Sequence, residues 1–372
     1  MTVLRRVRVN RHPTSSGRLQ SNMTHSKICS SSKFPFLLFT AGVCSLVLAC
    51  SDDASDDAGS DDDKGAGGTN DGGVGGTPAG DGDAGEDELR GSCKVDERVG
   101  NFVTYLGGSD RSTVLDGSIA QVVVPSAVPE LLLDEGECRL LGPQNLFCSE
   151  SCAFGMVCAG DDECVPEREA LDAGTVTITG LEADFSSEPN GITLKYSGSF
   201  SDPYPGFVQG SAIELSTAGG AIEGFSLRAR GVSPIETALN DVPVASGNGV
   251  ALTWEATGVD RSQSEVFVNF QINTHGATTG WIECVGEDDG EMEIPEPLIT
   301  RLMTMGLSGF PRMTLTRRSV DSVHNADGCV QLSIESSMDI DLVVDGVTSC
   351  TKAEDCPEGQ SCDEAELWCV DE

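Results

Sequence analysis

The chain has few aromatic residues and few cations. Aromatic side chains make up 5% of its 372 residues, and 23 basic residues stand against 60 acidic ones. Seven of the basic residues lie within residues 1–49, which contain no acidic residue, so 23 − 7 = 16 basic residues remain in the rest of the chain against 60 acidic ones. A surface this acidic repels nucleic acid and anionic lipid headgroups. We therefore exclude DNA and RNA as partners.

Histidine and the common catalytic motifs are also scarce. After residue 49 the only histidines are His275 and His324, and the sequence contains no P-loop, no G-x-S-x-G and no H-E-x-x-H. Carboxylates are plentiful, and a glycosidase pair is defined by separation in space, so the sequence leaves such a pair open. We expect a protein that is not an enzyme and uses no cofactor, with a hydrolase as the less favoured alternative.

The longest hydrophobic run is too short to cross a membrane comfortably. It reads FPFLLFTAGVCSLVLA, from Phe34 to Ala49, whereas a transmembrane helix needs about 20 apolar residues. Basic residues precede it, which is typical of a secretory signal. Residues 1–49 are therefore predicted to be a signal peptide, and Met23 gives a more compact start than Met1.

The hydrophobic run ends in Val47-Leu48-Ala49-Cys50, which resembles the lipobox of bacterial lipoproteins. The resemblance implies that the peptide before Cys50 is removed and that Cys50 carries the acyl chains, a palmitate-type modification. Two or more chains anchor a protein stably in a membrane. Ser51 and the aspartates after it resemble signals for the outer membrane and the cell surface. An ordinary signal peptide with an incidental cysteine remains the alternative.

Residues 50–90 are predicted to be the lipid attachment site and a disordered tether. Residues 51–90 contain eleven glycines and thirteen acidic residues, too little apolar surface to offset the entropy of ordering. A flexible coil of that length spans about 35 Å and lifts the folded part off the membrane. The aspartates lack the spacing of an EF-hand loop.

The cysteines after Cys50 predict the plan of the folded part. Their number is even, and in an exported chain an even set indicates disulfides rather than zinc ligands. They are Cys93, Cys138, Cys148, Cys152, Cys158, Cys164, Cys284, Cys329, Cys350, Cys356, Cys362 and Cys369.

Two stretches, 146–168 and 348–372, repeat one four-cysteine pattern with a glycine three residues before the third cysteine. Four cysteines allow three pairings. We favour first-to-third and second-to-fourth, with the other four cysteines forming one bridge in each β segment. These modules resemble units in secreted, lipid-anchored proteins of Gram-negative bacteria with large genomes, a resemblance that implies no activity. The predicted bridges are Cys148–Cys158, Cys152–Cys164, Cys350–Cys362, Cys356–Cys369, Cys93–Cys138 and Cys284–Cys329.

Between the modules, short β-branched runs alternate with period two and are separated by turn residues. The chain is therefore predicted to be mainly β: an antiparallel β-sandwich or jelly-roll-like region over 172–347, preceded by a smaller β unit over 91–145. The segment from Glu296 has the apolar spacing of a short helix, which we expect to cover one end of the sandwich.

Two loops carry candidate ligand sites, each with a structural alternative. Asp288, Asp289 and Glu291 offer oxygens that suit calcium, but a solvated hairpin turn around Asp289-Gly290 is the favoured explanation; no metal site is favoured. The aromatic residues of the loop 200–207 could stack on a sugar ring or simply cover the core. These aromatic residues are Phe200, Tyr204 and Phe207.

These features together predict a surface-exposed lipoprotein of the outer membrane with a non-catalytic binding or adhesion role. Its expected partners are the membrane, through the lipid, and a glycan or protein at the cell surface. A structural envelope lipoprotein that faces the periplasm is the alternative.

Overall fold

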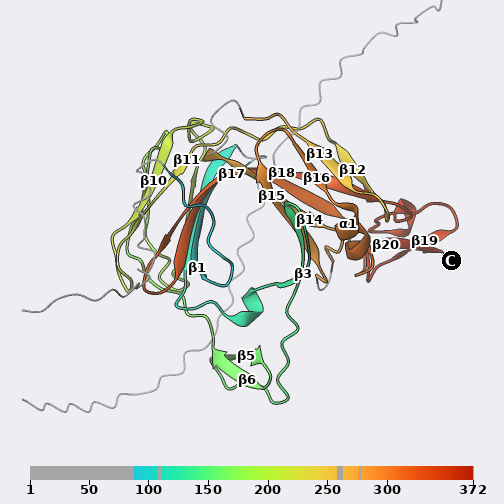
Figure 1. Cartoon of the computed structure of the whole chain (residues 1–372), viewed down its shortest axis with the longest axis horizontal. Coiled ribbons are helices and arrows are strands. Elements are labelled where there is room, and N and C mark those ends of the chain that lie inside the picture. The colour runs from blue at the N-terminus through green and yellow to red at the C-terminus, as the bar shows by residue number, and fades with distance from the viewer. Residues whose placement is uncertain (1–87, 108–110, 258–262, 276–277, 372) are drawn as a thin grey trace, which may run out of the picture. The chain divides into compact units, whose positions relative to one another are not determined.

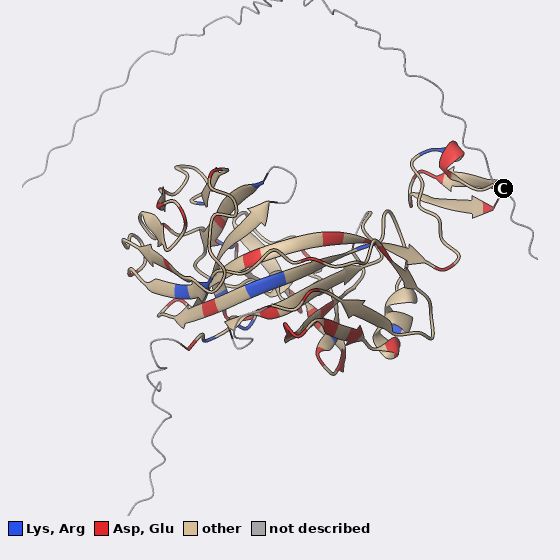
Figure 2. Cartoon of the chain, turned by 90° about the horizontal axis from the view of Figure 1, so that it is seen from above, with Lys and Arg blue, Asp and Glu red and all other residues tan. Residues whose placement is uncertain are grey.

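The computed structural model describes residues 88–107, 111–257, 263–275 and 278–371. They form a mainly β structure with one α-helix among these residues (Figure 1). The predicted signal peptide, Cys50 and nearly all of the predicted tether lie outside the described residues. Figure 2 shows acidic residues spread over strands and loops, with far fewer basic ones.

A ten-stranded sheet forms the framework. Two long strands at its centre, β17 (Arg312–His324) and β18 (Cys329–Val344), pair antiparallel along the whole of β17. β1 and β12 both pair parallel with β18, each along a different part of it. The strands in order are β3 (Glu130–Glu135), β4 (Cys138–Gly142), β15 (Trp281–Glu287), β14 (Glu265–Gln271), β17, β18, β1 (Arg98–Gly107), β2 (Ser112–Ile119) and β9 (Tyr196–Phe200), with β12 (Asp241–Val244) beside β18.

Smaller sheets and one helix complete the described elements. The four-stranded sheet has the order β11 (Ser226–Arg230), β10 (Ala212–Thr217), β7 (Val176–Thr179) and β8 (Phe185–Ser187). The two-stranded sheets are β13 (Val250–Thr253) with β16 (Glu291–Ile294), β5 (Met156–Gly160) with β6 (Glu163–Pro166), and β19 (Gln360–Asp363) with β20 (Trp368–Asp371). The helices are α1 (Glu296–Met303) and the short 3-10 turns η1 (Pro125–Ala127) and η3 (Ala353–Asp355).

Alternation along the long strands explains why one face of the large sheet carries two separate hydrophobic cores. Leu332 and Ile334 of β18 pack into one core with β1, β2, β7, β10 and β11. Ile340 and Leu342 of the same strand pack into the other, with β12–β16 and α1. Residues two apart on a strand share a face, so the same face of β18 contributes to both cores.

A buried ion pair lies on that same face, in phase with the core residues of β17. Arg317 and Asp288 have side chains that are 2% and 0% exposed, and Arg317 Nε is 2.6 Å from Asp288 Oδ2. Asp288 also accepts hydrogen bonds from Trp254 Nε1 at 2.8 Å and Ser264 Oγ at 3.3 Å. A carboxylate that is removed from water needs such partners to offset its desolvation.

Side chains of β17 and β18 also pair with the backbone of the segment that starts at β11, the edge strand of the four-stranded sheet. Asp321 accepts a hydrogen bond from the amide of Arg228 at 3.0 Å, and Ser319 from that of Arg230 at 2.9 Å. Ser336 accepts one from the amide of Ile235 at 3.0 Å. An unpaired strand edge exposes donors that must be satisfied when buried, and the polar residues of the long strands satisfy these.

The sequence prediction of a mainly β, sandwich-like fold is confirmed, but the separate N-terminal β unit over 91–145 is wrong. β1 pairs with β18, and β4 pairs with β15, so strands from both predicted segments share one sheet. β18 is one continuous strand of 16 residues. Alternation predicts that a run is a strand but does not identify its partner, which can lie hundreds of residues away.

All twelve described cysteines form disulfides, and the four bridges predicted within the modules are confirmed. The two predicted long bridges, Cys93–Cys138 and Cys284–Cys329, are wrong. The structure instead joins Cys93 to Cys329 and Cys138 to Cys284. The register of β4 and β15 places Cys138 directly opposite Cys284, a neighbour relation that only the sheet order creates.

The predicted helix is confirmed as α1. It begins after Pro295, has Pro297 in its first turn, and buries Leu298, Ile299 and Leu302. A proline in the first turn is well tolerated because its missing N–H would have no intrahelical acceptor. The buried residues belong to the core on the side of β14 and β15.

We predict that Asp288→Asn destabilises the protein by about 3–5 kcal/mol, because it leaves the charge of Arg317 buried without its counter-ion. Urea unfolding of the oxidised protein measures the change. The matched control is Asp289→Asn at the neighbouring exposed residue, for which we expect a change within about 0.5 kcal/mol. Equal unfolding midpoints for the two variants would contradict the buried pair. If Asp288→Asn fails to fold, the double variant Asp288→Asn with Arg317→Met should fold better than the single variant, because it also removes the buried positive charge.

Candidate functional site

The residues proposed for calcium do not form a site. Both carboxylate oxygens of Asp288 are bonded to Arg317, and Asp289 accepts a hydrogen bond from the amide of Glu291 at 3.3 Å. The hairpin alternative is also wrong, because β15 pairs with β14 and β4 whereas β16 pairs with β13. The segment 288–290 therefore carries the chain from one sheet to another, and the buried Asp288 has a structural role there.

Two of the three aromatic residues of the loop 200–207, Tyr204 and Phe207, cover the core. Phe207 is 2% exposed and Tyr204 packs against the same cluster, which lies between β1 and β10. The guanidinium carbon of Arg111 lies 5.1 Å from the centre of the Tyr204 ring. These contacts support the structural alternative over a sugar-stacking platform.

Among the described residues, the imidazole of neither His275 nor His324 hydrogen-bonds to a serine, threonine or cysteine side chain. His324 Nε2 is 3.2 Å from Glu97 Oε2, in an exposed pair. The pKa of Glu97 is lowered most by its hydrogen bond with Lys94 and next by its hydrogen bond with His324. His275 lies beside a small pocket that also contains Asn273 and Glu366.

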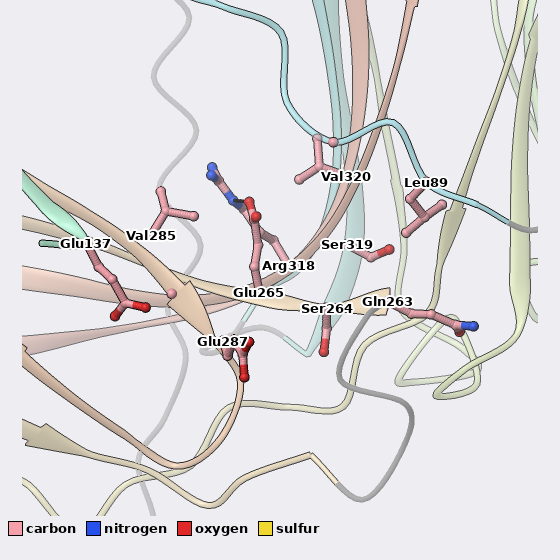
Figure 3. A pocket seen from close by; sticks show the side chains of 12 residues that line it. Leu89, Glu137, Gln263, Ser264, Glu265, Val285, Glu287, Arg318, Ser319 and Val320 are labelled. Atoms are coloured by element: carbon pink, nitrogen blue, oxygen red, sulfur yellow. Dashed lines mark hydrogen bonds and ion pairs between the residues drawn. The ribbon is translucent and has the colours of Figure 1, made fainter. Parts of the chain in front are cut away.

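The larger pocket is the main candidate site, and it has a volume of about 510 Å³. Glu265 begins β14, Val285 and Glu287 end β15, and Arg318 and Val320 lie in the middle of β17. The N-terminal segment 89–91 and Glu137, from the turn between β3 and β4, complete the wall. Figure 3 shows the side chains of Glu265 and Arg318 lying together, with Glu137 and Glu287 apart from them.

The sheet register places the charged residues of this pocket in one row across three strands. Glu287 is directly opposite Glu265, and Glu265 is directly opposite Arg318. Arg318 Nε lies 2.8 Å from Glu265 Oε1, and its guanidinium carbon lies 4.4 Å from the centre of the Phe267 ring. Arg318 is thus held by a carboxylate and an aromatic face.

The pocket has an excess of negative charge. With Glu137, Glu265 and Glu287 there are three carboxylates against the one guanidinium of Arg318. Within the described residues, Glu137 and Glu287 make no side-chain hydrogen bond or ion pair. The rest of the wall combines apolar side chains such as Leu89, Val285 and Val320 with the uncharged polar residues Gln263, Ser264 and Ser319. This combination suits a ligand with a cationic group beside an apolar body.

Arg98, at the start of β1, lies in the same electrostatic surroundings as Arg318. Burial is the main cause that lowers the pKa of Arg98, and the positive charges of Arg318 and Arg168 lower it further. Glu283 opposes this effect. Arg318 and Arg168 therefore both lie within electrostatic reach of Arg98.

Sequence reasoning missed this pocket because its residues come from segments up to 231 positions apart, from Leu89 to Val320. The sequence did contain one signal of this pocket, which is the position of Arg318 in the alternation along β17. Arg318 is one residue out of phase with Met313, Leu315 and Arg317, which places it on the face opposite the core.

Metal binding finds no other support in the described parts of the chain. The only groups of three potential ligands there are cystine sulfurs: Cys148, Cys152 and Cys164 in one module, and Cys350, Cys356 and Cys369 in the other. Their sulfurs are already bonded in disulfides.

No protein-family model matches the chain, and no curated protein matches it. Among the described residues there is no helix with the length and apolar character needed to cross a membrane.

We predict that Glu287→Lys raises the free energy of unfolding by about 0.2–1 kcal/mol, because it replaces two like charges directly opposite each other by a complementary pair. Chemical denaturation measures the change. Glu291→Lys is the matched control, since Glu291 is also an exposed strand carboxylate but faces Thr253. If both variants change stability equally, the charge row across the pocket is not formed as described.

Proposed function

We propose that this chain is an exported lipoprotein, anchored through Cys50 to the outer membrane and exposed at the cell surface, whose tethered β domain is a non-catalytic binding or adhesion module. The observation that carries the proposal is the pairing of the cysteines. All twelve from Cys93 to Cys369 pair among themselves, so the described part of the chain offers no cysteine to Cys50.

The disulfides support export. Six bridges in one chain are typical of an oxidising compartment, and two of them join positions 236 and 146 residues apart. Bridges that close long loops restrict the unfolded chain most. A domain held in this way suits an exposed position, where unfolding would lead to proteolysis.

The acidic pocket supports a binding role and indicates the chemistry of the partner. Three carboxylates and apolar walls favour a cationic group on the partner, such as a lysine or arginine side chain of a protein at the cell surface. Such binding is reversible, and its rate falls with ionic strength because charge attraction steers the encounter. The tether between Cys50 and the domain gives the pocket reach away from the membrane.

We predict that Cys50→Ala releases the protein from membranes, because the acyl chains can no longer be attached. Cell fractionation with an antibody against the β domain measures the release, and the mass of the mature protein checks for acyl chains on Cys50. Cys44→Ala is the matched control, since this cysteine lies within the predicted signal peptide and should leave anchoring unchanged. A Cys50→Ala protein that stays with the membranes would contradict the anchor.

Protease treatment of intact cells then tests the side of the membrane. We expect cleavage in residues 51–90 to release a fragment that contains the disulfide-linked domain. If the fragment appears only after the outer membrane is breached, the domain faces the periplasm and the adhesion role is wrong, even where the Cys50 experiment has supported the anchor.

A further inference from the structure

The loop between β8 and β9 contains one of the two Asn-Gly pairs of the chain. These pairs are Asn190-Gly191 and Asn248-Gly249. An asparagine before a glycine can react with its own backbone, because glycine has no side chain to obstruct the approach of its amide nitrogen. Asn190 and Gly191 are both exposed, and a Cβ built on Gly191 would meet no atom within 4 Å. The first pair is therefore open to water and free of steric obstruction.

Hydrogen bonds hold the side chain of Asn190 against the turn that follows it. Asn190 Oδ1 accepts from the amide of Ile192 at 2.9 Å and from that of Thr193 at 3.1 Å. The amide of Leu194 donates to the backbone carbonyl of Asn190 at 2.8 Å and closes the turn. Asn190 is thus placed like the N-cap of a helix, whose side-chain oxygen satisfies the first free amides.

The amide of Gly191 lies inside this turn but has no acceptor among the described residues. Attack of its nitrogen on the side-chain carbon Cγ of Asn190 closes a five-membered ring, and two groups held in one turn need no encounter in solution. Negative charge develops on Oδ1 during the attack. The amides of Ile192 and Thr193 already donate to that atom, which is how an oxyanion hole lowers a barrier.

We propose that Asn190 is a self-modification site, at which the chain converts asparagine into aspartate and isoaspartate. The nitrogen of Gly191 forms a bond to Cγ of Asn190 and loses its proton to water. The side-chain Nδ2 takes up a proton and departs as ammonia, which leaves a cyclic imide. Water then opens the imide. Hydrolysis at Cγ gives aspartate, and hydrolysis at the main-chain carbonyl gives isoaspartate.

Both products add a negative charge to the loop, but they differ in the backbone. Aspartate keeps an oxygen that accepts from the amides of Ile192 and Thr193. Isoaspartate carries the main chain through the former side chain and lengthens it by one methylene group between β8 and β9, so the turn closed by Leu194 loses its geometry. The reaction needs only water, and the converted fraction therefore grows with the age of the molecule. The proposal is independent of the acidic pocket and of the anchor at Cys50.

Asn248 has the following glycine but lacks the hydrogen bonds. It is exposed, and among the described residues no group donates to its side chain. A Cβ built on Gly249 would lie 3.0 Å from the carbonyl oxygen of Ile294, so this pair is also more closely packed. We expect Asn248 to convert more slowly than Asn190 in the folded chain.

Asn325 has the hydrogen bonds but lacks the glycine. Its Oδ1 accepts from the amides of Asp327 at 2.9 Å and Gly328 at 3.0 Å, whereas the residue after it is Ala326. The methyl group of alanine obstructs the attacking nitrogen. Asn325 should therefore also convert more slowly than Asn190.

The test is peptide mapping by mass spectrometry of the oxidised full chain, kept at mildly alkaline pH and sampled over days. We expect Asn190 to convert about tenfold faster than Asn248, less than the roughly 10²–10³ that one donor provides in a buried oxyanion hole. In the reduced chain, unfolded in guanidinium chloride, both should convert at similar rates, since each precedes a glycine and the turn is lost. An equal ratio in the folded and unfolded chains would overturn the proposal.

Two variants in the turn complete the test. Gly191→Ala should slow the conversion of Asn190 to the rate of Asn325, and it should leave the fold intact because a Cβ there meets no neighbour. Thr193→Ala is the matched control, since Thr193 is exposed and keeps its backbone amide, so its rate should be unchanged. Urea unfolding midpoints check that both variants fold. Equal conversion of Asn190 in the two variants would also overturn the proposal.

Discussion

The buried contact between Arg317 and Asp288 is the interaction on which the arrangement of the two cores depends. Arg317 has five N–H groups, and all find acceptors: Nε and Nη2 bond to Asp288, Nη2 also to the carbonyl of Glu255, and Nη1 to Ser233 and Pro234. These acceptors belong to three connecting segments that arrive from different sheets. A guanidinium satisfied in this way permits one relative placement of the segments, because any other leaves a buried charge without partners. We infer that the pair acts mainly on specificity, since a well-packed apolar replacement is often as stable.

Along the whole of β17, buried polar groups have hydrogen-bond partners in the same way as Arg317 does. Each residue of β17 that faces the core side is either apolar, such as Leu315, or polar with a defined partner, such as Ser319 and Asp321. The polar ones lie where the backbone of β11 and the segment after it approach, so the sheet face provides acceptors for a neighbouring strand edge. Asp321 also accepts a hydrogen bond from the amide of Arg90 at 3.1 Å, which attaches the first described residues to the same strand. The polar residues on the core side of β17 are therefore found where the backbone of another element crosses the strand.

Much of this architecture could be predicted from the sequence where the interactions are local. The bridges of the modules span 10 to 13 residues, and α1 is defined by one short amphipathic run. The long bridges and the sheet order could not be predicted, because Cys138 meets Cys284 only after β4 and β15 have paired. The same limit applies to the sites. Asp288 looked like a calcium ligand in a polar run, and only the fold shows that its counter-ion is an arginine. The pocket beside β14 combines residues whose sole local signal is the phase of a strand.

A comparison of the two four-cysteine modules distinguishes the features that the disulfides determine from those that depend on contacts with the rest of the chain. Both have the same cysteine pairing and a two-stranded hairpin that contains the third and fourth cysteines. In the C-terminal copy Cys350 is 1% exposed, and Gly309 bonds to the module backbone. In the other copy Phe154 is fully exposed, where the aligned residue of the C-terminal copy is Glu358. Four cysteines at suitable spacing are enough to form the hairpin, since a module of this size has no core. The attachment of the C-terminal module depends on two hydrogen bonds to Gly309. The same cysteine pattern therefore occurs in two different structural settings. Sequence spacing alone cannot distinguish these settings.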